Sequence, residues 1–175
     1  MRSTETTVAI ALGSNMDDRY ELLGSGVRMI AGIDGVAVVS TTAVEETEAF
    51  GPPQPPFLNQ MVLVTTTLTL AALLSALQLV EAQHGRARTL AKGPRTLDLD
   101  IVWADETTLT SRELLVPHPG LADRTFWQRE LAELLGLERA GDAIVTAAVH
   151  AGLDTAEREG VKHERRWSGS WDTVA

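Results

Sequence analysis

The sequence predicts an α+β fold in which helices pack on one face of a sheet. Its apolar segments follow the order strand, helix, strand, strand, helix, strand, with helical patterns after them. The chain has 175 residues, enough for one hydrophobic core. We therefore expect a single domain over residues 1–175, of which 155–175 form a polar tail. No internal repeat or low-complexity segment interrupts the pattern.

The first half of the chain carries two strand patterns around a helix pattern. Residues 7–12 predict a buried strand, and a helix is expected from about Asp17, capped by Asp17 or Asn15. The β-branched run 36–44 predicts the second strand. The proline-rich segment FGPPQPPFLNQ, residues 50–60, is too short for an interdomain linker and is expected to form a stiff wall.

The second half of the chain again carries two strand patterns around a helix pattern. Residues 58–67 are predicted to form a central strand, because apolar and polar residues do not alternate cleanly along them. Thr69 is expected to cap a helix that ends at Gly85 and buries an apolar stripe. A strand follows within GPRTLDLDIVWAD, residues 93–105. Two further helices are predicted at 126–135 and 142–151.

Composition excludes several classes of function. A net charge of −9 argues against nucleic-acid binding through bulk charge, and the absence of cysteine excludes disulfides and thiolate chemistry. The N-terminus lacks the pattern of a signal peptide, and the most apolar helical stretch, 70–80, is too short to span a bilayer. We expect a cytoplasmic protein, a monomer or weak dimer, without nucleic-acid or membrane partners.

Two carboxylates stand at alternate positions in the apolar run TLDLDIV. Strand geometry places Leu97, Leu99 and Ile101 on one face, and Asp98 and Asp100 on the other, roughly 6–7 Å apart. Carboxylates on a buried strand are costly unless something compensates them. Asp-x-Asp can hold Mg²⁺ together with substrate phosphates. Taken alone, the motif is more often the solvated face of an edge strand.

A basic segment precedes the acidic strand. Between Glu81 and Asp98 there are four cations and no acidic residue. Arginine forks match phosphate oxygens, so we interpret this segment as a lid over a Mg²⁺-bound polyphosphate. A solvated loop is the alternative. The cations are Arg86, Arg88, Lys92 and Arg95.

Three further groups of residues suit ligand binding. His118 lies between two prolines, six residues before Arg124, although a lone histidine is more often structural. Gln78 and Glu81 share one helix face, where simple exposure is the alternative. The third group suits a flat heteroaromatic ring whose edge carries donors and acceptors, with core packing as the alternative. It consists of Phe57, Asn59 and Phe126.

The ordered segments ALGSN, FLNQMVLVTT, E…GRAR, GPRTLDLDIV and VPHP…DRTF resemble the 6-hydroxymethyl-7,8-dihydropterin pyrophosphokinases of folate biosynthesis, over about residues 8–135. The resemblance implies a ferredoxin-like antiparallel sheet packed by helices, with additional C-terminal helices. It also implies Mg²⁺-dependent transfer of the β,γ-pyrophosphoryl unit of ATP to the pterin hydroxymethyl group, which leaves AMP.

The resemblance also implies roles for individual residues. Asp98 and Asp100 would bind two Mg²⁺ ions and, with Arg86 and Arg95, carry catalysis. ATP would be bound by Gln78, Glu81, Arg88, Lys92, Ile101, His118 and Arg124. The pterin would be bound by Thr47, Phe50, Phe57, Asn59 and Phe126.

The chain departs from the family pattern at three places. Ala91-Lys92 stands where many members have Arg-Trp, Glu48-Ala49 stands where many have Pro-Pro, and WQREL follows Phe126. We expect an active kinase that holds its nucleotide less tightly. The main alternative is a paralogue that binds pterin or nucleotide without catalysis. A glycosyltransferase, whose Asp-x-Asp also holds a divalent ion, is more distant because such enzymes usually need a larger domain.

Overall fold

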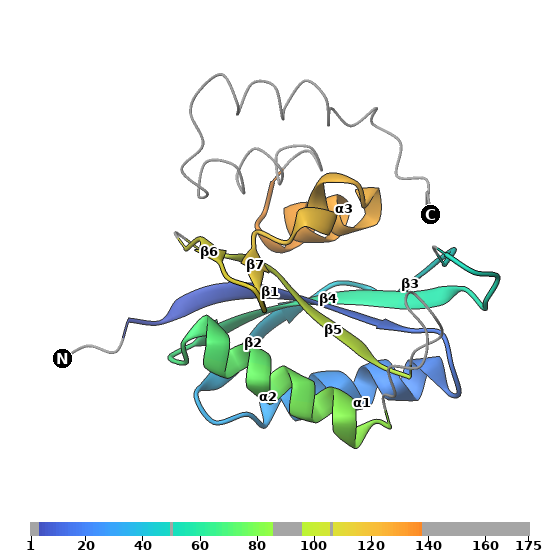
Figure 1. The fold of residues 1–175 in the computed structure, drawn as a ribbon, viewed down its shortest axis with the longest axis horizontal. Helices are drawn as coiled ribbons and strands as arrows, with labels where there is room; N and C mark the ends of the chain where they lie inside the picture. Colours follow the sequence, from blue (N-terminus) through green and yellow to red (C-terminus); the bar gives the residue numbers. More distant parts are fainter. Residues whose placement is uncertain (1–3, 50, 86–95, 106, 138–175) are drawn as a thin grey trace.

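Five strands form one antiparallel sheet in a computed structural model that describes residues 4–49, 51–85, 96–105 and 107–137 (Figure 1). The strand order is β2-β4-β1-β5, and the short β3 pairs with the start of β4. The elements are β1 (Thr6–Ser14), α1 (Arg19–Ala31), β2 (Val36–Thr41), β3 (Glu45–Thr47), β4 (Phe57–Thr66), α2 (Leu70–Gln83), β5 (Asp98–Ala104), β6 (Leu109–Thr110), β7 (Leu115–Val116), the 3₁₀ helix η1 (Pro119–Ala122) and α3 (Thr125–Leu134).

The topology confirms the predicted ferredoxin-like fold. With β3 set aside as a short addition, β1, α1, β2, β4, α2 and β5 follow the order strand, helix, strand, strand, helix, strand. The first strand lies between the third and the last, and every strand pair is antiparallel. As a result, β5 is an edge strand, and its side chains can be approached from a face of the sheet and from around the edge.

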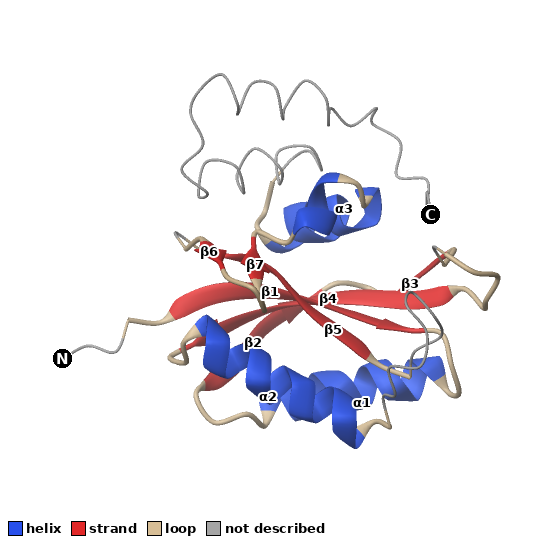
Figure 2. Ribbon diagram, viewed as in Figure 1, coloured by secondary structure: helices blue, strands red, loops and turns tan. Residues whose placement is uncertain are grey.

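Helices cover both faces of the sheet, so the expectation of helices on one face was wrong. α1 and α2 lie on one face and α3 lies on the other (Figure 2). Val8 and Ile10 of β1 belong to the core under α1 and α2, whereas Ala9 and Ala11 belong to a second core with Trp127 of α3. A strand buried on both sides needs a packing layer on each face.

The predicted strand 36–44 is divided into two. β2 ends at Thr41, and Thr42 then exchanges hydrogen bonds with Met61: its amide donates to the Met61 carbonyl at 2.9 Å, and its Oγ1 accepts from the Met61 amide at 3.0 Å. β3 follows and places Thr47 opposite Phe57. The division therefore brings two predicted pterin contacts together.

The cap of α1 differs from the prediction. Asp18 is the N-cap, and its carboxylate accepts a hydrogen bond from the Glu21 amide at 3.1 Å. The Asn15 amide instead donates to the Gln54 side chain at 2.9 Å and to the Pro55 carbonyl at 3.0 Å. Asn15 thus fixes the proline-rich segment beside the end of β1.

The later elements agree with the sequence where they are described. Thr69 caps α2 as predicted, and Gly85 follows the helix with φ +74°. α3 confirms the helix expected at 126–135. The helix predicted at 142–151 and the tail 155–175 lie outside the described residues. Within the described part of the chain, no helix combines the length and apolar character needed to cross a bilayer.

Candidate active site

The side chains of residues 97–101, at the start of β5, point to the two faces of the sheet as predicted. Leu97, Leu99 and Ile101 are each at most 3% exposed and belong to the core under α1 and α2. Asp98 and Asp100 point to the opposite side and are partly exposed. The strand therefore presents two carboxylates to solvent while its other face anchors it in the core.

The register of the sheet leaves space beside these carboxylates. Gly13 lies opposite Asp98 on one side and Asn59 on the other, and Ala11 lies opposite Asp100. A Cβ atom at position 13 would lie 3.4 Å from the Phe57 ring and 3.5 Å from the Asn59 Oδ1. A larger side chain at position 13 would therefore fill the space over β1.

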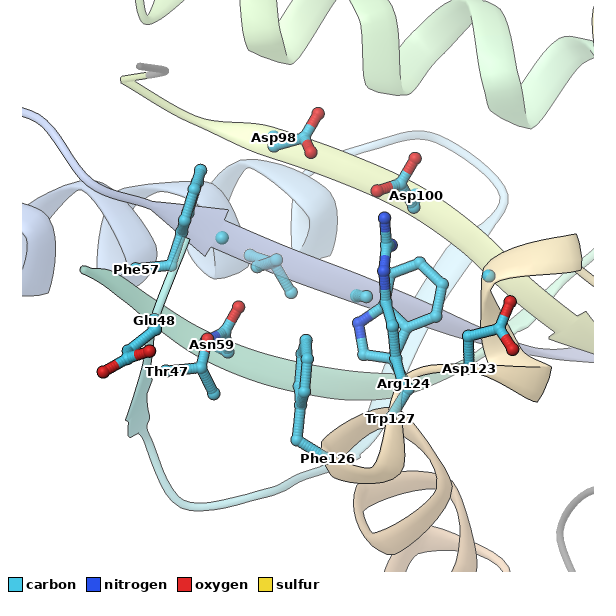
Figure 3. A pocket seen from close by; sticks show the side chains of 14 residues that line it. Thr47, Glu48, Phe57, Asn59, Asp98, Asp100, Asp123, Arg124, Phe126 and Trp127 are labelled. Carbon is cyan, nitrogen blue, oxygen red and sulfur yellow. The ribbon is translucent and has the colours of Figure 1, made fainter. Parts of the chain in front are cut away.

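That space is a pocket of about 320 Å³ between the sheet and the start of α3, which we call the aromatic pocket (Figure 3). Phe57 and Phe126 supply apolar surface from β4 and α3. Asn59 and Thr47 are its buried polar residues, and the Asn59 amide donates to the Thr47 Oγ1 at 2.6 Å. An apolar cavity with a few fixed polar groups is typical of a small-molecule site.

A second pocket, of about 330 Å³, lies around the edge of the sheet and is called here the edge pocket. Gln78 and Glu81 of α2 line one side, and Ile101 and His118 line it from β5 and the segment after β7. Arg112, which is not among the predicted site residues, also lines it. The structure thus gathers four predicted ATP-binding residues at one place.

The two pockets meet at the acidic pair, because Asp98 and Asp100 line both of them. A cation held there would lie between the occupants of the two pockets. Within the described residues, no three acidic or histidine side chains form a complete metal-binding cluster. A pair of carboxylates fits Mg²⁺, which usually keeps water and substrate phosphates among its ligands.

Glu81 is buried, in contrast to the alternative of an exposed helix residue. It is 5% exposed, and its Oε1 accepts a hydrogen bond from the Leu99 amide at 3.3 Å. Leu99 lies between the two aspartates. Glu81 therefore joins α2 to β5 at the acidic pair, whereas Gln78 is exposed on the rim of the edge pocket.

His118 has a fixed tautomer. Its Nδ1 accepts a hydrogen bond from the Gly120 amide at 2.9 Å, so the proton of the neutral ring is on Nε2. That Nε2 lies 3.8 Å from the Asp100 Oδ1. Burial and, after it, the charge of Arg124 lower the pKa of His118 to about 4, although Asp98 acts in the opposite direction. Near pH 7 the ring is thus a neutral hydrogen-bond donor.

This state of His118 gives a testable prediction. In ¹H–¹⁵N spectra of the ligand-free protein, we expect a ring with its proton on Nε2 that titrates at about pH 4. His118→Gln identifies its signals among the four histidines. The unfolded chain binds this proton more tightly, so protonation of His118 lowers the free energy of unfolding as the pH falls from 6.5 to about 4. A ring pKa near 6.5, or a proton on Nδ1, would contradict this assignment.

Arg124 and Trp127 form the corner of the aromatic pocket nearest Asp100. In Figure 3 the Arg124 side chain extends from the start of α3 toward Asp100, beside the Trp127 ring. The Arg124 Cζ lies 4.2 Å from the centroid of that ring. Trp127 is not among the predicted site residues, although its spacing of three residues from Arg124 is a helical contact spacing. Asp123, which lines the same pocket, was not predicted either.

An ion pair between a buried arginine and a half-buried glutamate connects the two sides of the aromatic pocket. Arg129 of α3 contacts Glu45 of β3 at 2.5 Å, and the Arg129 side chain is 5% exposed. Glu130 is also buried, and neither of its carboxylate oxygens has a hydrogen-bond partner among the described residues. Burial, followed by the charge of Glu45, raises the pKa of Glu130 well above its usual value, whereas Arg129 acts in the opposite direction.

Several predicted site residues lie outside the described residues. They are Phe50 and the four cations of the expected lid, Arg86, Arg88, Lys92 and Arg95. The Ala91-Lys92 departure lies there too, so the lid remains a prediction.

Comparison with known proteins identifies the family. Residues 9–136 match the family model described as 7,8-dihydro-6-hydroxymethylpterin-pyrophosphokinase (HPPK). The chain belongs to this family. This confirms the resemblance recognised in the ordered sequence segments.

Relatives of two sizes are similar to this chain. The 2-amino-4-hydroxy-6-hydroxymethyldihydropteridine pyrophosphokinase of Bacillus subtilis is 37% identical over 126 residues, which cover 71% of this chain and 75% of that protein. The folic acid synthesis protein fol1 of Schizosaccharomyces pombe is 37% identical over 134 residues, covering 75% of this chain. The chain spans 18% of the length of that protein and 17% of its Pneumocystis carinii counterpart.

A solved structure supports the fold. A crystal structure of HPPK-DHPS in complex with substrates has a TM-score of 0.56 and 11% sequence identity. The match covers 75% of this chain and 40% of that chain.

Proposed function

We propose that the protein transfers the β,γ-pyrophosphoryl unit of ATP to 6-hydroxymethyl-7,8-dihydropterin in folate biosynthesis, and that AMP and the pterin diphosphate are the products. The observation that carries this proposal is that Asp98 and Asp100 line both pockets, in a chain of the pyrophosphokinase family. A transferase that joins two substrates needs its charge-neutralising groups where those substrates meet.

The aromatic pocket is suited to the pterin. Phe57 and Phe126 offer ring faces to a flat heterocycle, and Asn59 and Thr47 offer hydrogen-bonding groups to its edge. Asn59 is held in place by its bond to Thr47. With the ring bound there, its hydroxymethyl group would be directed toward the acidic pair.

The edge pocket is suited to the nucleotide. Arg112 and the Nε2–H of His118 offer donors to phosphate oxygens, and Gln78 offers an amide on the rim. Arg124 approaches the same boundary from the other side (Figure 3). The predicted lid arginines, outside the described residues, would add to this set.

The reaction needs no protein nucleophile. The pterin hydroxyl oxygen forms a bond to the β-phosphorus, the bond from that phosphorus to the oxygen shared with the α-phosphorus breaks, and AMP leaves with that oxygen. The hydroxyl proton is released. Mg²⁺ held by Asp98 and Asp100 would neutralise polyphosphate charge. The chain's own contribution is to hold both substrates in line and to donate hydrogen bonds from His118 and Arg124.

Product analysis tests this proposal. The protein is incubated with Mg-ATP and the pterin, and AMP is resolved from ADP, with EDTA and pterin-free reactions as controls. AMP that requires both Mg²⁺ and pterin supports pyrophosphoryl transfer. ADP as the product would contradict it. Folded protein that binds pterin but forms no AMP would favour the catalytically impaired paralogue.

A cytoplasmic location and a monomeric or weakly dimeric state remain predictions from composition.

A further inference from the structure

We propose that Trp127 is a positioning residue, which holds Arg124 and His118 in the orientations in which they meet the phosphates of the nucleotide. The inference rests on the proposed function, because it assumes that a polyphosphate lies beside the acidic pair. Trp127 contacts both side chains: the Arg124 Cζ is 4.2 Å from its ring centroid, and the His118 ring centroid is 5.0 Å away.

The contact with Arg124 leaves the guanidinium available to a ligand. The side chain of Arg124 makes no hydrogen bond or ion pair with any described residue, and the indole face is its partner. A carboxylate partner would occupy the N–H fork of the arginine. An aromatic face instead stabilises the cation and leaves its five N–H donors free. This is the arrangement that phosphate binding requires.

The contact with His118 fixes the direction of its ring. The imidazole meets the indole edge-to-face, with an interplanar angle of 90°. Gly120 closes the same corner: a Cβ atom there would lie 3.0 Å from the His118 Nδ1 and 3.2 Å from the Trp127 Cζ3. The backbone amide of Gly120 also donates to that Nδ1. Together these contacts direct the Nε2–H toward the acidic pair.

Trp127 is itself immobilised by the fold. It is 4% exposed and belongs to the core between α3 and the sheet, together with Ala9, Met61 and Leu131. Its orientation is therefore set by packing, independently of either ligand. A rigid aromatic platform of this kind lets one residue orient two donors from different segments.

Two substitutions of Trp127 separate positioning from packing. Trp127→Leu keeps an apolar side chain but removes the aromatic face, whereas Trp127→Phe keeps a ring. Leu131→Ala is the matched control. Leu131 is 0% exposed in the same helix and core, and the ring contacts of Arg124 and His118 are with Trp127. Thermal unfolding, kcat, and dissociation constants for Mg-α,β-methylene-ATP and for the pterin are measured for each variant.

We expect Trp127→Leu to weaken binding of Mg-α,β-methylene-ATP about 10-fold and to lower kcat, with pterin affinity nearly unchanged. Trp127→Phe should restore most of the nucleotide affinity. Leu131→Ala should lose stability but retain nucleotide affinity. The proposal is overturned if Trp127→Leu and Leu131→Ala change nucleotide binding equally, or if Trp127→Leu weakens only pterin binding. Absence of AMP formation by the parent protein would instead count against the proposed function, since the binding measurements do not depend on turnover.

Discussion

Asp98→Asn and Asp100→Asn are each expected to lower the rate of AMP formation by about 10³-fold while the fold stays intact. Each substitution keeps the size of the side chain and removes a charge at the boundary of the two pockets. Both aspartates are partly exposed, so neither substitution disturbs the core.

Asp105→Asn is the matched control for this experiment. Asp105 follows β5, is exposed, and does not line either pocket. Turnover at saturating substrates, its dependence on Mg²⁺ concentration and the melting temperature are compared for the three variants. Parental turnover in Asp98→Asn or Asp100→Asn would remove the acidic pair from the reaction. An equal loss in Asp105→Asn would show that general charge near β5 matters instead.

Arg129→Met is expected to lower the free energy of unfolding by about 2 kcal/mol, because it leaves the half-buried carboxylate of Glu45 without its cation. Arg129 pairs with Glu45, and Glu130 lies in the same buried region. Since the pair joins α3 to β3, pterin affinity should fall as well. Urea unfolding and pterin binding provide the measurements. A loss below about 1 kcal/mol, as for an exposed ion pair, would contradict a stabilising role of the Arg129–Glu45 pair.

A second substitution serves as the control for the Arg129–Glu45 ion pair. Glu45→Gln in the Arg129→Met background should recover part of the lost stability, and the double-mutant cycle gives the coupling energy.

Glu130→Gln tests the raised pKa of the Glu130 carboxyl group. The folded protein holds the Glu130 proton more tightly than the unfolded chain, so that stabilisation is present below about pH 4.5 and is lost as the pH rises through the folded pKa. Glu130→Gln should therefore weaken the decline of stability with rising pH, and an unchanged pH dependence would contradict the raised pKa.

Most of the sheet was predictable because its signals are local. The alternation of Leu97, Asp98, Leu99 and Asp100 predicted which way each side chain points, and the structure agrees. The position of α3 on the second face of the sheet was not predicted. The sequence of a strand buried on both faces indicates that each face is covered, but it does not identify the covering segment. The apolar face of α3 lies against residues of β1 and β4 that are distant in sequence.

The parts of the site that the sequence did not reveal depend on contacts between distant segments. Asn15 is a suitable residue for a helix cap, but Asp18 caps α1 and the Asn15 amide instead donates to Gln54, 39 residues away. The pairing of Trp127 with His118 arises only once η1 and α3 pack together. The acidic pair and the pocket residues Phe57 and Phe126 were found because they lie in short, ordered motifs that identify the family.

We propose that Asp98 and Asp100 hold the metal between the two substrates. The most direct test replaces Mg²⁺ by Mn²⁺ in the complex with α,β-methylene-ATP and the pterin, and measures paramagnetic relaxation of the nucleotide ³¹P and of the pterin hydroxymethyl protons. We expect strong enhancement at both ligands in the parent protein. In the Asp98→Asn/Asp100→Asn double variant we expect the enhancement to be lost at the pterin protons, whereas Mn²⁺ stays on the nucleotide phosphates. Enhancement at the phosphates alone in the parent protein, or equal enhancement of the pterin protons in the double variant, would contradict this assignment.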